Sequence, residues 1–393
     1  MLELGQWVSA AFAGKILADL GAEVIKVEPP GGDRLRSYGP FPDNQPDSEH
    51  SGLFLYLHTN KKGVTLDLDR EQGKQILASM VSNVDIVIHD MPINYLASRG
   101  LSYDSLGASN QSLIMLEMSP FGQTGPYANY KGFEVNAAAL GGVVMQLGLP
   151  DHPPLNPPLL LGHYQAGLTG AMALMVALTS RDFLGLGQRI DLSESDSWAT
   201  FHTGNGVVQW LFGDRRAMRH GRRVAGGPYP NTILGCKDGE IRLQAMTKRE
   251  WRRIIDMMGN PSWAEDERFQ DRLKMNELYA DELDDLIEDW LSKRTKEELF
   301  QEFYEFGVPF TPVNTTADFL NHPHLEAREF FVEVEHSRAG RMRQPGPPYK
   351  FTKTPCKTKR PAPLLGEHNE TVYEALAGMS EDQICALKSL GVI

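Results

Sequence analysis

The first 120 residues alternate between helix-like and strand-like patterns of apolar positions. Ala10 to Leu20 has helical periodicity and stops before Gly21, a residue suited to the left-handed position after a helix. Residues 71–82 predict a second helix. Short β-branched runs predict strands at 23–28, 64–68, 84–88 and 113–118. Because helix-length segments separate these strands, we predict an α/β fold with a Rossmann-like, doubly wound parallel sheet.

The middle of the chain continues this alternation. The segment Gln165 to Ser180 is rich in Ala, Gly, Leu and Met, which indicates a buried helix with small residues where backbones approach closely. Gln188 to Ser193 predicts a further strand, and residues 194–213 predict a helix. Strand-like residues at 330–334 and a final helix are predicted in the tail.

Composition changes near residue 215, where a second pattern begins. Asp238-Gly239 between two apolar runs predicts a hairpin turn, and charged amphipathic helices are predicted at 248–258 and 279–306. We therefore predict a smaller α+β domain over 225–320. Five arginines precede the second pattern and are open to interpretation as a surface or dimer patch: Arg215, Arg216, Arg219, Arg222 and Arg223.

Charge and cysteine content narrow the class of protein. A net charge of −12 over 393 residues is unsuited to coating nucleic acid or an anionic membrane. The three cysteines are widely spaced and form no CxxC pair, so we expect neither a disulfide framework nor a metal site. The N-terminus lacks the basic start and small-residue cleavage site of a signal peptide, and no apolar run reaches about 18 residues. We expect a cytoplasmic protein.

Several common motifs of doubly wound enzymes are missing from the sequence. No GxGxxG follows the first strand and no GxxxxGK[ST] occurs, so a loop that cradles phosphates is not indicated. There is also no HExxH zinc motif and no GxSxG nucleophile elbow. These observations argue against nicotinamide, nucleoside triphosphate, zinc and serine hydrolase chemistry.

Seven segments spread along the chain carry a family resemblance. They are FAGKILADLGAEVIKVEPPGGD (12–33), TNKKGVTLDL (59–68), MSPFGQTGPYANYKGFEVNAAALGGV (118–143), GLGQRIDLSESD (185–196), PYPNTILGCKDGEIRL (228–243), GVPFTPV (307–313) and APLLGEH (362–368). On these segments the chain resembles the family III CoA-transferases, or CaiB/BaiF family, to which formyl-CoA transferase, carnitine CoA-transferase and α-methylacyl-CoA racemase belong. The resemblance implies a small domain and a large Rossmann-like CoA-binding domain to which the C-terminal tail returns, so that the large domain covers 1–215 together with 325–393. It also implies that two chains interlock as a dimer and that a few residues normally precede the first strand.

The resemblance implies acyl transfer through an aspartate. In the family, this aspartate attacks the acyl-CoA thioester and forms a mixed anhydride, and it lies in a Leu-Gly-Asp turn before a Gly-rich helix. The matching run here is Leu160 to Gly167, and His163 stands at the aspartate position. Two interpretations stay open: His163 forms an acyl-imidazole, or it is a polar residue in a site that has lost its nucleophile.

Glu134 is the second candidate catalytic residue. The resemblance places Phe133 and Glu134 at the family's second site segment, where the racemase branch has a histidine at position 133. The standard racemase pair is absent, but Glu134 beside His163 would supply one acid and one base. The alternative is that Glu134 caps a helix at 135–140, because acidic residues are favoured at helix N-termini.

Coenzyme A carries anionic phosphates, which basic side chains and backbone N–H groups bind. Lys131 is favoured because it adjoins the candidate site, and the glycines of the Gly226–Tyr229 loop would allow close approach to a thioester. Trp7, Phe133 and Tyr164 are apolar candidates for a bulky or aromatic acyl group, or core residues. The full set of candidates for CoA binding by resemblance is Asn60, Lys61, Lys62, Arg99 and Lys131.

Three functions are compatible with the sequence, all with acyl-CoA as a ligand. The first is a CoA-transferase between acyl-CoA and a carboxylic acid. In this case the chain is the aspartate-lacking subunit of a hetero-oligomer, similar to benzylsuccinate CoA-transferase, in which two homologous chains pair. The second is an acyl-CoA racemase or epimerase that uses His163 and Glu134. The third is a CoA-binding protein without catalysis, and a homodimer is an alternative to the heterodimer.

Overall fold

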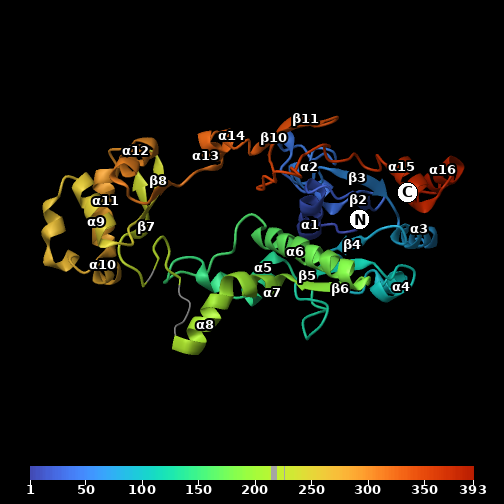
Figure 1. Ribbon diagram of the computed structural model, residues 1–393, viewed down its shortest axis with the longest axis horizontal. Coiled ribbons are helices and arrows are strands. Elements are labelled where there is room, and N and C mark those ends of the chain that lie inside the picture. Colours follow the sequence, from blue (N-terminus) through green and yellow to red (C-terminus); the bar gives the residue numbers. More distant parts are fainter. Residues whose placement is uncertain (214–218, 225) are drawn as a thin grey trace. The chain divides into compact units, whose positions relative to one another are not determined.

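The chain forms two compact units, each with its own hydrophobic core. The computed structural model describes residues 1–213, 219–224 and 226–393 (Figure 1). Residues 145–155 belong to the second unit, where the Arg219 Nε and Gly221 N–H groups donate to the carbonyls of Leu149 and Gly148. The first unit comprises Met1–Val144, Asn156–Arg216 and Glu326–Ile393, and the second comprises Met145–Leu155 and Ala217–Leu325.

A six-stranded parallel sheet organises the first unit and confirms the predicted fold class. Its strand order is β3-β2-β1-β4-β5-β6, so the chain winds outward on one side of β1 and then on the other. In such sheets, ligands bind at the carboxyl ends of the strands, near the point where the order reverses. The strands are β1 (Leu2–Glu3), β2 (Val24–Glu28), β3 (Lys61–Thr65), β4 (Ile86–His89), β5 (Ile114–Ser119) and β6 (Arg189–Ser193).

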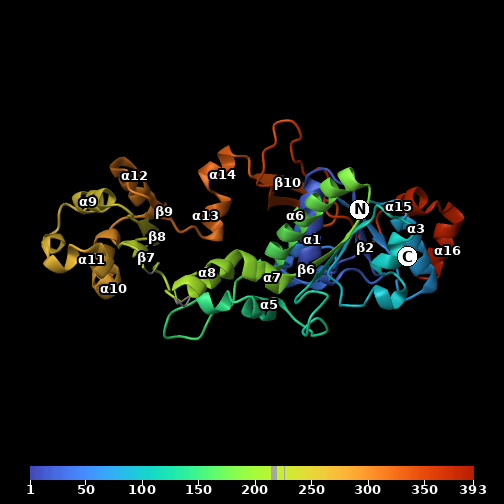
Figure 2. The same ribbon diagram turned by 60° about the horizontal axis from the view of Figure 1, so that its bottom comes forward.

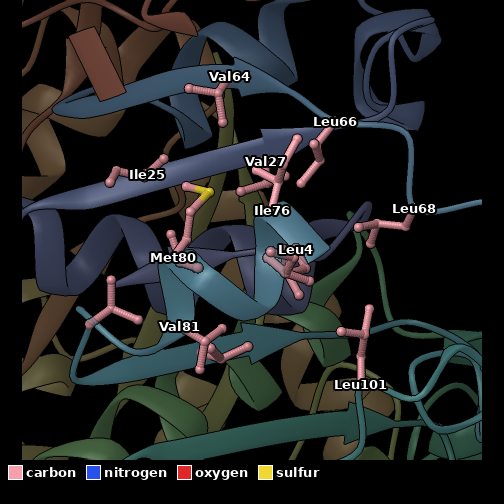
Figure 3. Packing of buried hydrophobic residues seen from close by; sticks show 14 of the residues in the cluster. Leu4, Ile25, Val27, Val64, Leu66, Leu68, Ile76, Met80, Val81 and Leu101 are labelled. Carbon is pink, nitrogen blue, oxygen red and sulfur yellow. The ribbon is translucent and has the colours of Figure 1, made fainter. Parts of the chain in front are cut away.

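Alternate residues of the central strands β4 and β5 feed two separate cores, because successive side chains point to opposite faces of a sheet. On one face Ile25, Val27 and Val64 pack against Ile76 and Met80 of α3 (Glu71–Val81) (Figure 3). The other face packs against residues of α1 (Val8–Asp19) and α6 (Leu161–Leu184), through Ile86, Ile88, Ile114, Leu116 and Met118. Both faces of the central strands are therefore buried, as their near-continuous apolar sequences require.

Helices α1 and α6 cover one face, and α3 with the C-terminal helices covers the other (Figures 1 and 2). A Cβ added at Gly167 of α6 would lie 2.7 Å from the Ser9 carbonyl oxygen, so the small residue allows close packing against α1. The helices of this unit are α1 (Val8–Asp19), α2 (Gly52–Leu57), α3 (Glu71–Val81), α4 (Tyr103–Gly107), α5 (Glu134–Leu140), α6 (Leu161–Leu184), α7 (Glu194–Trp198), α8 (Gly204–Gly213), α15 (Asn369–Ala377) and α16 (Glu381–Ser389). Strands β10 (Phe331–His336) and β11 (Gly340–Pro345) form a hairpin.

The second unit packs helices on a small antiparallel sheet of order β7-β8-β9. The predicted turn at Asp238-Gly239 joins β7 to β8. The core includes Leu234, Ile241 and Leu283, all almost fully buried. Its elements are β7 (Asn231–Cys236), β8 (Gly239–Gln244), α9 (Lys248–Met257), α10 (Arg272–Leu278), α11 (Ala280–Leu291), α12 (Lys296–Phe306), β9 (Phe310–Pro312) and α13 (Thr316–Leu320), with α14 (Pro323–Ala327) where the chain returns to the first unit.

Three predicted element boundaries are wrong. The single helix predicted at 279–306 is two helices, because Thr295 and Glu298 form a reciprocal capping box that begins α12. The helix predicted at 194–213 contains a π-helical turn at Ala199–Thr203 between α7 and α8. The strand predicted at 64–68 begins earlier, since pairing with β2 starts at Lys61. The pattern of apolar residues along the chain carries no information on helix capping or on which strands pair, so it could not predict these boundaries.

Gly187→Ala should destabilise the fold by about 1–3 kcal/mol, because overpacking of this kind costs that much in well-packed structures. A Cβ at Gly187 would lie 1.9 Å from the Leu113 carbonyl oxygen, where β6 docks beside β5. Gly31→Ala is the matched control, since no atom lies within 4 Å of its added Cβ. Thermal and urea denaturation followed by circular dichroism measure both variants. Equal midpoints for the two would contradict the prediction.

Candidate functional site

His163 lies in the first turn of α6, and the backbone just before this helix is strained. Leu159 and Leu160 both have positive φ values, 55° and 58°, which β-carbon-bearing residues adopt at a cost. Strained backbone persists where surrounding structure holds it, and it clusters at functional sites. In this turn His163 is buried, with 7% of its surface accessible to solvent.

Glu194 is the hydrogen-bond partner of His163. The distance between His163 Nδ1 and Glu194 Oε1 is 2.8 Å, and the Ser9 hydroxyl donates to the same oxygen at 2.9 Å. Glu194 is the first residue of α7 and follows β6 directly, so it stands at the carboxyl end of a strand. Sequence reasoning missed Glu194, although it lies in the 185–196 segment. An acidic residue immediately after the predicted strand at 188–193 was the available signal.

The pKa of His163 is raised above its ordinary value. Burial lowers it, because an apolar environment disfavours the charged ring, but Glu194 outweighs this through its hydrogen bond and its negative charge. Glu134 and Asp90 raise the pKa further through their charges. The imidazolium therefore persists to higher pH than in a free histidine.

Glu134 is brought to the same turn, but its carboxylate binds the backbone. The Gly162 N–H donates to Glu134 Oε1 with 2.5 Å between the two atoms. Glu134 begins α5, yet through this bond it satisfies an N-terminal amide of α6. Burial raises the pKa of Glu134, and the bond from Gly162 opposes that effect. The hydrogen-bonded acid and base pair here is His163 with Glu194. Glu134 bonds instead to the backbone of Gly162, the residue before His163.

The three apolar candidates differ in their surroundings. The rings of Trp7 and His163 are nearly perpendicular, with centroids 6.0 Å apart and planes at 88°. Phe133 is 64% exposed just before Glu134. Tyr164 packs against Phe12 at 4.9 Å, and burial raises its pKa to about 12. Of the three, Trp7 makes direct contact with the candidate catalytic ring.

Two of the CoA-binding candidates are engaged in holding the fold together. The Asn60 side chain donates to Asp19 Oδ1 (2.7 Å) and accepts from the Lys359 N–H (2.6 Å), which ties the C-terminal segment to β3. Lys61 is 1% exposed, and its Nζ lies 2.6 Å from Glu3 Oε2. Burial lowers the pKa of Lys61 to about 8, while the charge of Glu3 opposes the shift.

The other three basic candidates lie nearer to solvent. Lys62 pairs with Glu23, and Arg99 pairs with Asp69 while its guanidinium lies over the Tyr95 ring. Lys131 is exposed two residues before Phe133. Lys131 is thus the basic candidate that adjoins the second site segment in the chain, and its role in CoA binding stays a prediction.

The arginine cluster near residue 220 is engaged within the second unit. Arg222 and Arg223 both pair with the buried Asp284, to which the Tyr229 hydroxyl also donates at 2.7 Å. Arg219 donates to the backbone carbonyls of the 149–152 segment. Arg215 and Arg216 lie outside the described residues. The described arginines of this cluster therefore stabilise the second unit.

Within residues 1–213, 219–224 and 226–393, no group of three or more His, Cys, Asp or Glu side chains could hold a metal ion. In the same residues, no helix is long and apolar enough to cross a membrane.

Comparison with known proteins gives a consistent result. The sequence pattern described as CoA-transferase family III matches residues 1–369. Succinyl-CoA–D-citramalate CoA-transferase of Chloroflexus aurantiacus is 32% identical over 402 residues, which cover 100% of this chain and 96% of that protein. Succinyl-CoA:(R)-benzylsuccinate CoA-transferase subunit BbsE of Thauera aromatica is 31% identical over 94% of this chain and 90% of that protein. A crystal structure of a CaiB/BaiF family protein from Brucella suis matches with a TM-score of 0.87 and 28% identity, covering 95% of this chain and 97% of the other.

Lys61→Met should destabilise the protein by about 3–5 kcal/mol, because it removes one partner of a buried charged group, Glu3. Lys62→Met is the matched control and should change stability by less than about 1 kcal/mol, since its partner Glu23 is largely exposed. Urea denaturation measures both effects. Calorimetric titration with CoA then tests binding in the stable control variant. A Lys61→Met variant as stable as wild type would contradict the structural role.

Proposed function

This chain belongs to CoA-transferase family III, and we propose that it is the subunit of a heteromeric CoA-transferase that lacks the nucleophilic aspartate. The family assignment and the enzyme class agree with the sequence prediction. In the proposed enzyme, a homologous chain supplies the aspartate, and acyl-CoA and a carboxylic acid are the substrates. The observation that carries the proposal is His163, which stands in the Leu-Gly-Asp turn and is bound by Glu194.

The chemistry of the imidazole supports the assignment of the nucleophile to the homologous chain. A carboxylate nucleophile gives a mixed anhydride, which reacts with carboxylates and thiolates, whereas an acyl-imidazole hydrolyses readily in water. The bond from Nδ1 to Glu194 occupies one ring nitrogen. Glu194 also places a second negative charge where an attacking carboxylate would have to form. The surroundings of residue 163 are therefore suited to a histidine rather than to an ionised aspartate.

Exposed apolar side chains support assembly with a second chain. Monomeric proteins rarely expose contiguous apolar patches of more than a few hundred Å². In α6 and α8, many large apolar residues are at least 47% exposed: Leu168, Met172, Met175, Val176, Phe183, Val207, Val208, Leu211 and Phe212. A homologous partner would cover such surfaces, and BbsE is by its name one subunit of a CoA-transferase.

Succinyl-CoA is the first donor to test, because the names of both similar proteins described above contain it. Co-expression with a homologue that carries Leu-Gly-Asp should yield a copurifying complex that transfers CoA from succinyl-CoA to carboxylic acids. The chain alone should not catalyse this transfer. Failure to copurify, or full transfer activity of the chain alone, would contradict the proposal. Deuterium incorporation at the α-carbon of a 2-methylacyl-CoA would instead favour an isomerase.

His163→Asp should gain little transfer activity by itself, because Glu194 lies where its charge raises the pKa of the new carboxyl group. Adding Glu194→Gln removes that charge, so the double variant should transfer CoA at least about tenfold faster than the single variant, which corresponds to about 1.4 kcal/mol. Succinyl-CoA consumption with an acceptor acid measures both rates. Glu194→Gln alone is the control and should remain inactive without a partner chain. Equal rates for the single and double variants would show that Glu194 does not oppose a nucleophile at this position.

A further inference from the structure

A buried chain of hydrogen bonds joins three elements at the first turn of α6. Ser9 of α1 and His163 of α6 both bond to Oε1 of Glu194, the first residue of α7. We propose that Glu194 is a positioning residue for His163: it fixes the imidazole with its proton on Nδ1 and leaves Nε2 as the nitrogen that faces the substrate. The inference rests on the proposed function only in placing substrate at His163.

The bonding pattern indicates that Glu194 is an ionised acceptor. Oε1 already receives the Ser9 hydroxyl and the ring, and an ionised carboxylate oxygen accepts such bonds without donating. A carboxylate only accepts hydrogen bonds, so in the proposed arrangement the ring donates from Nδ1 to Glu194 Oε1.

The ring is also constrained from a second direction. Trp7 stands nearly perpendicular to the imidazole at 88°, with 6.0 Å between ring centroids. With Nδ1 bonded and the indole packed beside it, the ring has little freedom to flip. A 180° flip about the Cβ–Cγ bond would put Cδ2 in the place of Nδ1 and break the bond to Glu194. The geometry thus favours one tautomer of the neutral ring.

Three acidic groups face His163 from different elements. Glu194 comes from α7, Glu134 from α5, and Asp90 from the residue after β4. Of these, Glu194 makes the hydrogen bond to the ring. Its removal should therefore lower the pH at which the imidazolium loses its proton. In the charged ring, Nε2–H donates to a carboxylate or thioester oxygen, and in the neutral ring Nε2 accepts a proton.

Nitrogen-15 NMR of the full-length, histidine-labelled protein tests the inference without reference to catalysis. The chain has 11 histidines, so His163→Gln identifies the resonances of interest. We expect the neutral wild-type ring to carry its proton on Nδ1 and to titrate above about 6.5. An Nε2–H tautomer in the wild-type protein would overturn the proposal, and this measurement needs no other variant.

Glu194→Gln should lower the pH midpoint of His163 by about one unit, as loss of a close opposite charge does. Ser9→Ala is the matched control, since it removes the other donor to the same oxygen and leaves the ring bond in place. It should keep the Nδ1–H tautomer and shift the midpoint less. A Glu194→Gln protein that titrates like wild type would also overturn the proposal.

Transfer kinetics separate this inference from the proposed function. In a purified complex with an aspartate-bearing homologue, Glu194→Gln should move the pH profile of kcat by the shift seen for the ring. Glu194→Asp should partly restore it. If the pH profile of kcat stays fixed while the titration midpoint of the His163 ring moves, His163 takes no part in the reaction. If no pairing transfers CoA but the tautomer and midpoint behave as expected, the proposed function fails and the positioning role of Glu194 stands.

Discussion

A parallel sheet covered on both faces places every residue of the candidate site. Because successive side chains of a strand point to opposite faces, the central strands β4 and β5 feed two cores. The candidate site lies beyond the strand ends and in the helices that dock on the sheet. Glu194 follows β6, Asp90 follows β4, and Ser9 lies in the helix that follows β1. The sheet brings these residues together although they are distant in sequence.

The site itself is a set of acidic groups around one imidazole. Glu194 binds the ring, Glu134 caps the helix that carries it, and Asp90 adds negative charge. Such an environment stabilises an imidazolium and disfavours an additional carboxylate. A histidine at position 163 is thus matched by the charge of its neighbours.

Buried charges also explain why basic residues are poor guides to an anion site. Lys61 attracts attention in the sequence as part of a basic pair before a strand, yet it is enclosed with Glu3. Arg222 and Arg223 surround Asp284 in the second unit. A lysine or arginine in a sequence can serve a ligand or an internal carboxylate equally well, and the partner decides which. That partner is set by packing, not by neighbours along the chain.

The sequence by itself determined the fold class, the family and the unusual residue at position 163. Apolar runs of strand length separated by helices define a parallel α/β sheet, and ordered segments define the family, because both are local properties of the chain. Only the tertiary structure decided the partners of His163. Glu194 lies 31 residues away in sequence and Ser9 lies 185 residues from Glu194, and no periodicity relates them. Hydrogen bonds between elements depend on how helices dock on the sheet, so they appear only when the whole fold is in place.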